Sequence, residues 1–310
     1  MINGVLNIYK PKGFTSHDVV GKLRRISGQK KIGHTGTLDP EAVGVLPVCL
    51  GSATRLCDFL TQKDKEYIAL VRLGITTDTQ DTTGQVLKER KVEVTPGEVE
   101  KALNAFLGEY QQIPPMYSAV KVNGRKLYEL AREGKEVERK ARPVQIYAIQ
   151  ILDMKLPQLT IRVQCSKGTY IRTLCHDLGE ALGCGGAMAG LERTRSGMFT
   201  KETTITLEEL EERVAGRGEK SREEAFEGIL IPVDEMFKGY PALRLKPAME
   251  RLVENGNSFE EKHLISGQLK EEPQDCSQYR IYIKENNFVG IYEYRRKEKR
   301  FCPVKMFISQ

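Results

Sequence analysis

The stretch GHTGTLDPEAVGVLPVCLG, residues 33–51, joins a glycine-rich turn to an apolar segment. It places one carboxylate, Asp39, in the turn and then continues to Leu50 with Glu41 as its only other charged residue. An aspartate before proline is a common turn or helix-capping residue. A carboxylate can also act as a covalent nucleophile, and it then needs a cation beside it and an apolar wall that excludes water. Residues 42–50 can supply the wall, so the cation has to come from another part of the chain.

The length and composition allow two domains and exclude several kinds of site. A chain of 310 residues with 40% hydrophobic content can build a sizeable core. It has no N-terminal secretory signal and no apolar run near the ~18 residues of a membrane helix, so we expect a cytoplasmic protein without membrane association. Seven cysteines without a CxxC pair predict reduced thiols and no zinc site. No GxxxxGK[ST] or GxGxxG loop occurs, so we expect neither a metal nor a nucleotide cofactor.

The net charge of +6 is distributed unevenly along the chain. Residues 1–31 contain seven Lys and Arg against one acidic residue, and residues 115–142 contain eight against four. Residues 207–229 reverse the balance, with eight Glu against four Lys and Arg. Two basic segments beside an acidic one suggest a surface for a polyanion on one side of the molecule. The alternative is ordinary solvated charge.

Hydrophobic periodicity, capping residues and turn residues predict a mixture of strands and helices. We expect one helix to begin at Ser16 or His17 and end at Gly28, a second to follow the cap Thr95, a third to follow a turn at Lys167-Gly168, and a fourth to begin near Thr206. In the second helix the predicted apolar face contains Val99, Leu103, Phe106 and Leu107. Strands are predicted within 4–10, 66–74, 143–156 and 158–165, and a hairpin within 281–296 with Asn286 and Asn287 at its tip.

The segment between Pro114 and Pro143 has an irregular, basic and only partly helical pattern, which indicates a long insertion. Loops of this length in compact domains are usually functional or disordered. Its apolar residues could dock on a partner; they are Tyr117, Leu127, Tyr128 and Leu130. Short strands follow a break near residue 238, so residues 239–310 predict a second, small, mostly β domain.

Three further side chains are candidates for the same site as Asp39. Arg172 follows Tyr170 by two residues, so on a strand both would face the same side, and a guanidinium can clamp a carboxylate with two hydrogen bonds. Tyr67 could stack on a planar base, although strand tyrosines usually pack in a core. His34 lies in the same turn as Asp39, where a structural role is the alternative. A surface position on a strand is the alternative for Arg172.

Seven motifs occur together and in order, and they carry a family resemblance. They are GVLNIYKPKGFTSHDVV, GHTGTLDPEAVGVLPVCLG, KEYIA, LGITTDTQDTTG, IPPMYSAVKVNGRKLYELAREG, CSKGTYIRTLCHDLG and LERTRSGMF. Over nearly its whole length the chain resembles the bacterial TruB-type tRNA pseudouridine synthases, which isomerise the T-loop uridine at tRNA position 55. The bare N-terminus and the insertion at 114–143 resemble the bacterial members more than the relatives that work with guide RNAs.

The resemblance implies an α+β fold, with a mixed, mainly antiparallel sheet and flanking helices. It implies a catalytic domain at 1–238 that carries the basic insertion at 114–143, and a small β-rich PUA-like RNA-binding domain at 239–310. It assigns Asp39 as the catalytic residue. The implied substrate contacts are His34 beside the target nucleotide, Tyr67 stacked on the target base, Tyr170, Arg172 paired with the catalytic carboxylate, and Leu191 as an apolar wall.

The resemblance also implies tRNA as the partner, bound through its T-arm and acceptor end, by a monomer that needs no protein partner, metal or cofactor. The base has to leave its stack, which costs roughly a few kcal/mol, and the insertion is expected to order on RNA as a mobile clamp. Asp39 could attack C6 of the ring or C1′ of the ribose, or remove the 2′ proton. One alternative is a non-catalytic tRNA-binding or folding chaperone. Another is a hydrolase or phosphotransferase, which would need magnesium ligands or a Walker-type loop, and the sequence contains neither.

Overall fold

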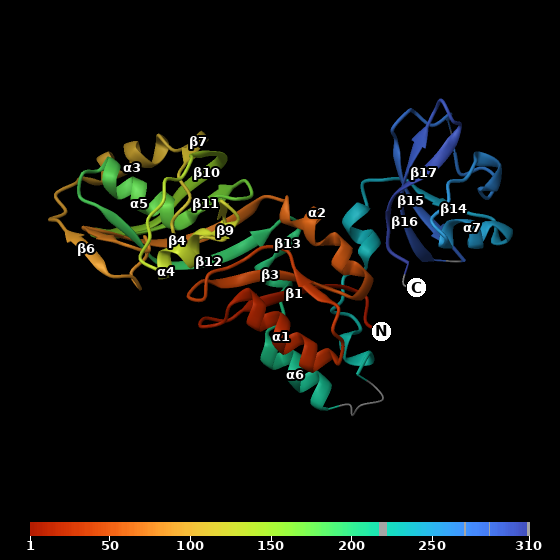
Figure 1. Ribbon diagram of the computed structural model, residues 1–310, viewed down its shortest axis with the longest axis horizontal. Coiled ribbons are helices and arrows are strands. Elements are labelled where there is room, and N and C mark those ends of the chain that lie inside the picture. Colours follow the sequence, from red (N-terminus) through yellow and green to blue (C-terminus); the bar gives the residue numbers. More distant parts are fainter. Residues whose placement is uncertain (217–221, 270, 285, 309–310) are drawn as a thin grey trace.

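A mainly antiparallel sheet of nine strands organises the first two thirds of the chain in this computed structural model (Figure 1). The structure describes residues 1–216, 222–269, 271–284 and 286–308. Along the sheet the order is β1-β3-β12-β4-β11-β10-β7, with β2 paired to β3 and β13 to β12; among its described pairs only β12 and β3 run parallel. The strands are β1 (Gly4–Lys10), β2 (Ile32–His34), β3 (Val43–Leu50), β4 (Lys65–Leu73), β7 (Gly108–Gln112), β10 (Arg142–Lys155), β11 (Gln158–Cys165), β12 (Gly186–Ser196) and β13 (Phe199–Thr200).

The helices flank this sheet, as the α+β prediction requires. The α-helices are α1 (Ser16–Ser27), α2 (Cys57–Thr61), α3 (Pro96–Asn104), α4 (Leu127–Arg132), α5 (Ile171–Ala181), α6 (Leu207–Ala215) and α7 (Glu250–Glu254). Short 3₁₀ turns are η1 (Gly51–Leu56), η2 (Lys201–Thr203), η4 (Glu224–Phe226), η5 (Val233–Phe237), η6 (Pro247–Met249) and η7 (Glu261–His263). Among the described residues, none of these helices is both long and apolar enough to cross a membrane.

The predicted helix ends are largely confirmed, because local capping determines them. Thr15, Thr95 and Thr206 each form a capping box with an acidic residue three positions later, and Gly28 closes α1 in the left-handed conformation. The apolar face predicted for the second helix is wrong at its end. Helix α3 stops at Asn104, and Leu107 is exposed.

The apolar segment that follows Asp39 forms strand β3, which is buried on both faces. On one face Leu46, Val48 and Leu50 pack with α1 and α6, and on the other face Val45 and Cys49 pack in a separate cluster. A strand covered on both sides has no polar face, which explains why the sequence here is continuously apolar rather than alternating. Packing on both faces fixes the position of β3, and β3 in turn supports the turn that carries Asp39.

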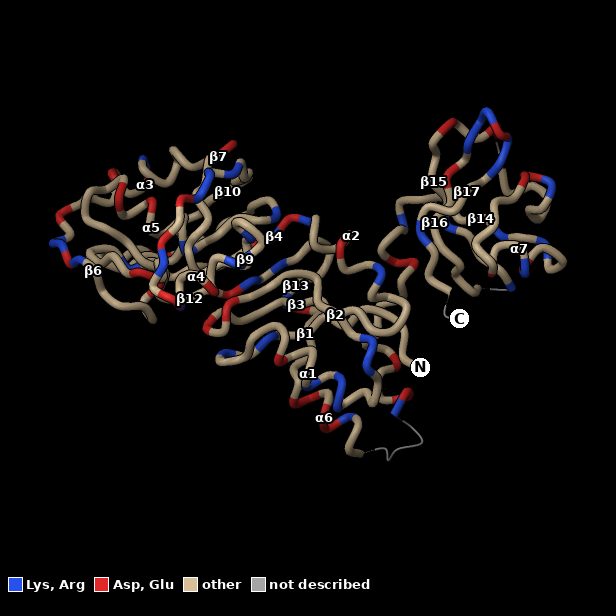
Figure 2. Tube along the Cα trace, in the orientation of Figure 1, with Lys and Arg blue, Asp and Glu red and all other residues tan. Residues whose placement is uncertain are grey.

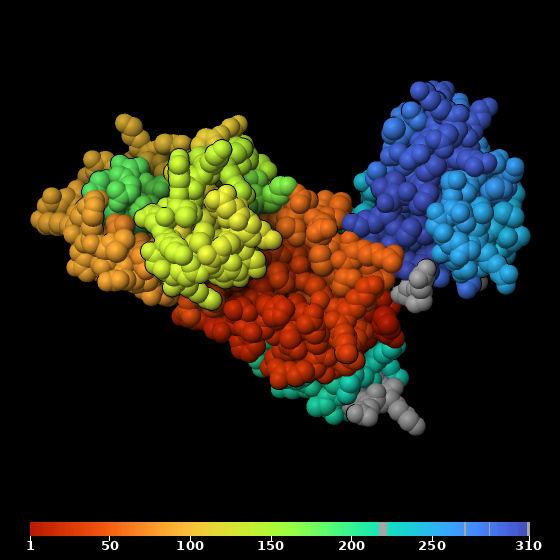
Figure 3. Space-filling view, in the orientation of Figure 1, coloured from red at the N-terminus to blue at the C-terminus, as the bar shows by residue number. Residues whose placement is uncertain are grey.

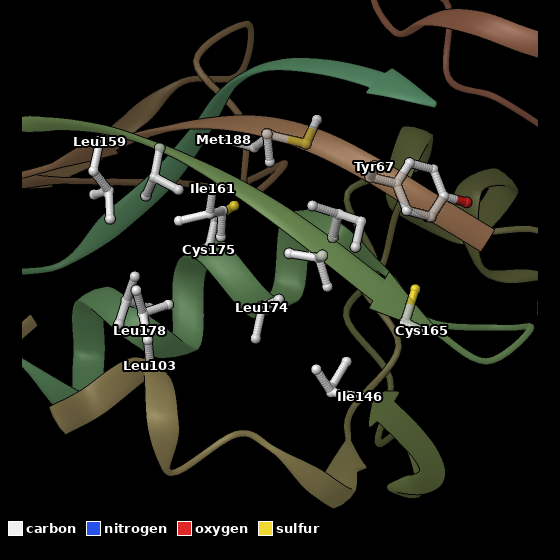
Figure 4. Packing of buried hydrophobic residues seen from close by; sticks show 14 of the residues in the cluster. Tyr67, Leu103, Ile146, Leu159, Ile161, Cys165, Leu174, Cys175, Leu178 and Met188 are labelled. Carbon is white, nitrogen blue, oxygen red and sulfur yellow. The ribbon is translucent and has the colours of Figure 1, made fainter. Parts of the chain in front are cut away.

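A second core lies between the sheet and the helices α3 and α5 (Figure 4). Strand β4 alternates buried and partly exposed residues, so one of its faces enters this core. Leu174 and Leu178 of α5 pack against Ile161 of β11. Tyr67 lies at one end of the cluster, with its hydroxyl group pointing out of it. This end of the core is therefore where the sheet presents an aromatic ring to the candidate site.

The C-terminal residues form a separate four-stranded sheet with its own core, at one end of the molecule (Figures 1 and 3). Its strands are β14 (Ala242–Arg244), β15 (Gln278–Ile283), β16 (Asn287–Arg295) and β17 (Arg300–Met306). The predicted hairpin is present, but Asn287 already pairs with Ile283. Asn287 therefore belongs to the second strand rather than to the tip, and residue 285 is outside the described residues.

The insertion at 114–143 contains a two-stranded ribbon and the short helix α4. The ribbon consists of β8 (Lys121–Val122) and β9 (Arg125–Lys126), and a second small ribbon elsewhere joins β5 (Ile75–Thr77) to β6 (Val86–Glu89). The expectation that Leu127 and Leu130 remain free to dock on a partner is wrong, because both are already buried. Tyr117 and Tyr128 are half-buried.

Candidate active site

Asp39 lies in the connection between β2 and β3, where both of its chain neighbours are fixed by hydrogen bonds. The amide of Leu38 donates to the hydroxyl of Ser16 at 2.9 Å. The ammonium of Lys10 donates to the carbonyl of Pro40 at 3.1 Å and to two further carbonyls. Lys10 is fully buried, and this burial lowers its pKa to about 8. The backbone that carries Asp39 is therefore held against β1 and the start of α1.

Arg172 approaches Asp39 from the first turn of α5 and contacts both carboxylate oxygens. Its Nε lies 3.0 Å from Oδ2, and its Nη2 lies 3.4 Å from Oδ1. Nη2 also donates to the carbonyl of Tyr117 at 2.8 Å, and Nη1 donates to the carbonyl of Thr79 at 3.2 Å. The guanidinium side chain is only 7% exposed, whereas that of Asp39 is 39% exposed. The cation is thus buried behind a carboxylate that stays open to an incoming group.

The structure brings Arg172 to Asp39, but not from a strand. The expected strand geometry at Tyr170 and Arg172 is wrong, because β11 ends at Cys165. Gly168 then takes a φ of 79°, a left-handed conformation that suits glycine and turns the chain into α5. Tyr170 is the residue before the helix, and Arg172 lies in its first turn.

Two opposing effects set the protonation of Asp39. Burial is the larger and raises the pKa of its carboxyl group above the ordinary value, and the negative charge of Asp81 adds to this. The positive charges of Arg172 and Lys10 lower the pKa but do not fully compensate. The carboxylate is therefore less stabilised than a surface aspartate, which makes it more reactive once it is ionised.

Asp81 is a second carboxylate of the site that the sequence did not predict. It lies in the loop between β5 and β6, and its Oδ1 accepts hydrogen bonds from the hydroxyl of Thr79 and from the amide of Thr83, at 2.8 and 3.0 Å. Its Oδ2 lies 3.8 Å from Nη1 of Arg172. The arginine is therefore placed between two carboxylates, one fixed by its own loop and the other, Asp39, partly exposed.

Tyr67 lies close enough to Asp39 for the charge of the carboxylate to act on its hydroxyl, and Leu191 and His34 lie on other strands of the same sheet. Leu191 pairs with Ala69, two residues along β4 from Tyr67, so the two side chains share a face of the sheet. Burial raises the pKa of the Tyr67 hydroxyl, and the positive charge of Arg193 partly counteracts this. Burial and the same arginine lower the pKa of His34, so its imidazole is neutral near pH 7. These side chains form an aromatic and apolar wall.

Tyr170 is held by the base of the insertion. The buried side chain of Gln112 accepts a hydrogen bond from the Tyr170 amide at 2.7 Å and donates to the Tyr170 carbonyl at 2.9 Å. Burial raises the pKa of the Tyr170 hydroxyl, and the positive charges of Arg142 and Arg172 partly counteract this. Because Arg172 also binds the carbonyl of Tyr117, the first residues of the insertion and the first turn of α5 are positioned together.

Four residues of this site were not predicted from the sequence: Lys10, Asp81, Gln112 and Arg193. The alternation of Thr and Asp in TTDTQDTTG is typical of a structured polar loop and could have indicated Asp81. Gln112 precedes the paired prolines at the base of the insertion by two residues. Nothing in the local pattern marks Lys10 or Arg193 as buried, because burial of a cation depends on strands distant in sequence.

The arrangement suits acid–base or nucleophilic chemistry on a planar ring. A carboxylate with a raised pKa, a buried guanidinium and a tyrosine hydroxyl converge beside an apolar wall. Among the described residues no group of three or more His, Cys, Asp or Glu could hold a metal ion. Exposed lysines and arginines occur along α1, at Lys30 and Lys31 before β2, and in the insertion (Figure 2), where they can meet a polyanion.

Comparison with known proteins assigns the family. A model for the TruB family pseudouridylate synthase N-terminal domain matches residues 24–171, and a tRNA pseudouridylate synthase B C-terminal domain matches 172–238. A tRNA pseudouridine synthase B from Lachnoclostridium phytofermentans is 50% identical over 99% of this chain and 100% of its own length. Proteins of the same name from Clostridium novyi and Alkaliphilus oremlandii are 47% and 46% identical, over 94% and 98% of this chain and 95% and 97% of their own lengths.

Solved structures agree with this assignment. A Cbf5–Nop10–Gar1 complex contains a chain that is 30% identical, with a TM-score of 0.71 over 98% of this chain and 85% of that one. An archaeal box H/ACA Nop10–Cbf5 complex gives 28% identity and a TM-score of 0.70, over 99% and 86%. The fold and the relatives together define a pseudouridine synthase, an isomerase that makes pseudouridine in RNA. The chain belongs to the TruB family of pseudouridylate synthases, and its substrate is tRNA. The predicted family and enzyme class are confirmed, and the hydrolase or phosphotransferase alternative is set aside.

Proposed function

We propose that this enzyme converts the T-loop uridine at tRNA position 55 to pseudouridine, with Asp39 as its nucleophile. The observation that carries the proposal is the Asp39 carboxylate itself. It is partly exposed on one side, contacted at both oxygens by the buried Arg172, and carried by a backbone fixed on both sides by Ser16 and Lys10. A group that has to meet a reacting atom needs this kind of positioning.

The target base would leave its loop and enter the space beside Asp39. Bases of single-stranded loops can be unstacked at a cost of roughly a few kcal/mol and read by stacking on aromatic side chains. Tyr67 supplies the stacking surface, Leu191 the apolar wall, and His34 and Tyr170 flank the nucleotide. The neutral state of His34 suits contact with an uncharged nucleotide edge.

The reaction breaks the C1′–N1 bond and leaves its electron pair on the uracil ring, which turns and rejoins the ribose through C5. Asp39 has to be ionised for each of its three candidate roles, namely attack on C6, attack on C1′ or removal of the 2′ proton. Arg172 keeps the carboxylate charged and oriented through its two contacts. The apolar wall keeps water from competing for the intermediate.

The tRNA would contact both basic segments and the C-terminal domain. Residues 1–31 and the insertion at 114–143 supply phosphate contacts near the T-arm, and the PUA-like domain at 239–310 binds the acceptor end. The solved Cbf5 chains were found in complexes with Nop10, in one case together with Gar1. We propose that the present chain instead acts in the cytoplasm as a monomer, without a protein partner or a cofactor.

The test is incubation of the purified chain with unmodified tRNA, followed by mapping of pseudouridine at single-nucleotide resolution. We expect one modified position, in the T-loop. Modification at another position would contradict the proposed substrate site. Binding of tRNA without any pseudouridine would favour the alternative of a non-catalytic tRNA-binding or folding chaperone.

A further inference from the structure

Arg193 is the largest fully buried side chain of the described residues, with 1% of its surface exposed. It lies on β12 and pairs in register with Tyr67 on β4 and with Gly44 on β3. A Cβ atom at Gly44 would approach the carbonyl oxygen of Arg193 to 2.3 Å, and Gly44 has a φ of 107°. The absence of a side chain at Gly44 therefore lets the two strands close over the arginine.

The guanidinium of Arg193 is only partly satisfied. Its Nε donates to the carbonyl of Val45 at 2.7 Å, and its Nη1 donates to the carbonyl of Thr37 at 3.4 Å. Its Nη2 is buried and lacks a partner with hydrogen-bond geometry. Within the described part of the chain no carboxylate forms an ion pair with it. A buried cation without a counter-ion destabilises a fold, so its retention here indicates a role beyond packing.

Several titratable groups face Arg193 from the surrounding strands. Tyr67 pairs with Arg193 in register, so the two side chains share a face of the sheet, and the charge of Arg193 acts on the Tyr67 hydroxyl, Lys65 of β4, His34 of β2 and Lys10 of β1. Asp39 acts on Tyr67 as well, in the opposite direction. The Tyr67 hydroxyl points out of the core cluster (Figure 4).

We propose that Arg193 is a positioning residue of the isomerisation, which holds the Tyr67 hydroxyl at the ring and stabilises negative charge on that oxygen during proton transfer. This inference rests on the proposed function. After C5 bonds to C1′, a proton leaves C5, its electron pair forms the C5–C6 double bond, and the electrons of the N1–C6 double bond return to N1. The neutral Tyr67 hydroxyl donates its own proton to N1, and its oxygen, which is then negative, takes the C5 proton, so Tyr67 ends neutral and protons and charge balance. Arg193 acts through Tyr67 and does not contact the ring.

The experiment compares Arg193→Met, which removes the charge at similar length, with Arg193→Lys, which keeps it. Arg195→Met is the matched control, because Arg195 lies on the same strand and is partly exposed. With a T-arm hairpin in single-turnover assays, we expect Arg193→Met to slow the reaction about 100-fold or more while hairpin affinity stays within about threefold. Arg193→Lys should retain most of the rate, and Arg195→Met should behave as wild type.

Two further readouts separate the proposed role from a structural one. The pH–rate limb that depends on Tyr67 should move to higher pH in Arg193→Met, because the hydroxyl loses the neighbouring positive charge. In a Tyr67→Phe background, Arg193→Met should cost almost nothing more. Losses that multiply in the double variant, or a pH profile that does not move, would overturn the proposal.

A third measurement covers the case in which Arg193→Met does not fold, as shown by circular dichroism and thermal unfolding. The charge-conserving Arg193→Lys is then assayed with 3-fluorotyrosine at position 67, whose hydroxyl is more acidic. We expect this change to keep or raise the rate of Arg193→Lys, and a lowered rate would contradict the role. If the wild type forms pseudouridine and the Arg193 variants form it at the same rate, only this inference is overturned. Absence of pseudouridine from the wild-type reaction would instead contradict the proposed function.

Discussion

At the scale of single residues, the site depends on how Arg172 is shared between two carboxylates. Asp39 binds its Nε and Nη2, and Asp81 faces its Nη1 from 3.8 Å. Asp81 raises the pKa of Asp39, whereas Arg172 lowers it. The position of the acid limb of the pH–rate profile should therefore respond to Asp81, although Asp81 does not contact the Asp39 carboxylate in this structure.

We predict that Asp81→Asn moves the acid limb to lower pH. Asp39 has to be ionised to act, so activity is lost as the pH falls through its raised pKa. Removing the neighbouring negative charge lowers that pKa, and the lost activity returns at lower pH. Single-turnover rates on a T-arm hairpin between about pH 5 and about pH 8 measure this. Asp78→Asn is the control, because Asp78 binds the amide of Gln85 in the same loop. A limb that stays in place, or moves to higher pH, would show that Asp81 does not act on Asp39.

Tyr67 provides the second prediction at this scale. Tyr67→Phe should keep hairpin affinity, because the ring that stacks on the base is preserved, and stacking is worth roughly 1–3 kcal/mol per base. The turnover rate should fall strongly, because the variant loses the hydroxyl that we propose moves a proton beside Arg193, its register partner on β12. Binding and single-turnover rates of the same variant separate the two effects. A wild-type rate would reduce Tyr67 to a stacking surface.

The family motifs were sufficient to name Asp39, Arg172 and Tyr67, but they did not indicate the groups that hold them. The first two were expected to pair, and the structure places them in contact. Lys10 and Arg193 look like ordinary basic residues in sequence, since their burial depends on strands that meet only in the folded sheet. Long-range packing of this kind has no local signal.

At the scale of elements, the insertion and helix α5 are coupled at their bases. Gln112 makes two hydrogen bonds to the backbone of Tyr170, which immediately precedes α5. Tyr117 in turn accepts from Arg172. A change in the first residues of the insertion should therefore alter the position of the Arg172 side chain.

We predict that Gln112→Glu destabilises the protein and slows isomerisation. The carboxylate can still accept from the Tyr170 amide but cannot donate to its carbonyl. Leaving such a buried group unsatisfied costs roughly 1–3 kcal/mol. Denaturant unfolding and single-turnover rates measure the two effects. Gln111→Glu changes the exposed neighbour and should stay within about 0.5 kcal/mol of wild type. Equal stability of the two variants would show that the hydrogen bonds of Gln112 to the Tyr170 backbone do not stabilise the fold.

The insertion itself should order further when tRNA binds. In this structure its segment lies on the surface in front of the sheet, and only Leu127 and Leu130 of its predicted anchors are buried (Figure 3). We predict that replacing Lys121, Arg125 and Lys126 together by Gln weakens tRNA binding and flattens its salt dependence by roughly one unit per lost phosphate contact. The modified position should not change.

Hydrogen exchange tests the same prediction directly. Residues 118–140 should exchange fast in the free protein and slowly with tRNA, because closing a basic loop loses entropy that phosphate contacts can offset. A triple change of Lys88, Lys91 and Lys101, outside the insertion, serves as the charge-matched control and should affect the salt slope less. Equal protection with and without tRNA would mean that the insertion is already closed.

Helices were predicted more accurately than strands, for a physical reason. The caps of α1, α3 and α6 lie within three residues of their helices, so the sequence shows them directly. Strands β7 and β12 were not predicted, although β12 carries Leu191 and Arg193. Their partners lie far along the chain, and β12 pairs with both β3 and β4. A strand whose neighbours are distant is specified by tertiary packing rather than by its own pattern.

At the scale of the whole molecule, an aromatic cluster joins the two sheets. Phe237 of η5 lies 5.2 Å from Phe59 of α2, 6.3 Å from Phe288 of β16 and 5.7 Å from Phe307, measured between ring centroids. Arg55 adds a hydrogen bond to the carbonyl of Met306 at 2.6 Å. The C-terminal sheet is thus anchored next to α2 and can present a second surface to a tRNA that occupies the Asp39 site.

The measurement that most directly tests the central claim uses full-length unmodified tRNA with the wild type and with Asp39→Asn. Asparagine is nearly isosteric with aspartate, so fold and tRNA affinity should be preserved, as unfolding and binding measurements on both proteins will show. Pseudouridine mapped at single-nucleotide resolution should then appear at position 55 with the wild type and at no position with Asp39→Asn. Formation by the variant at more than about a few per cent of the wild-type rate would contradict the assignment of Asp39 as the nucleophile.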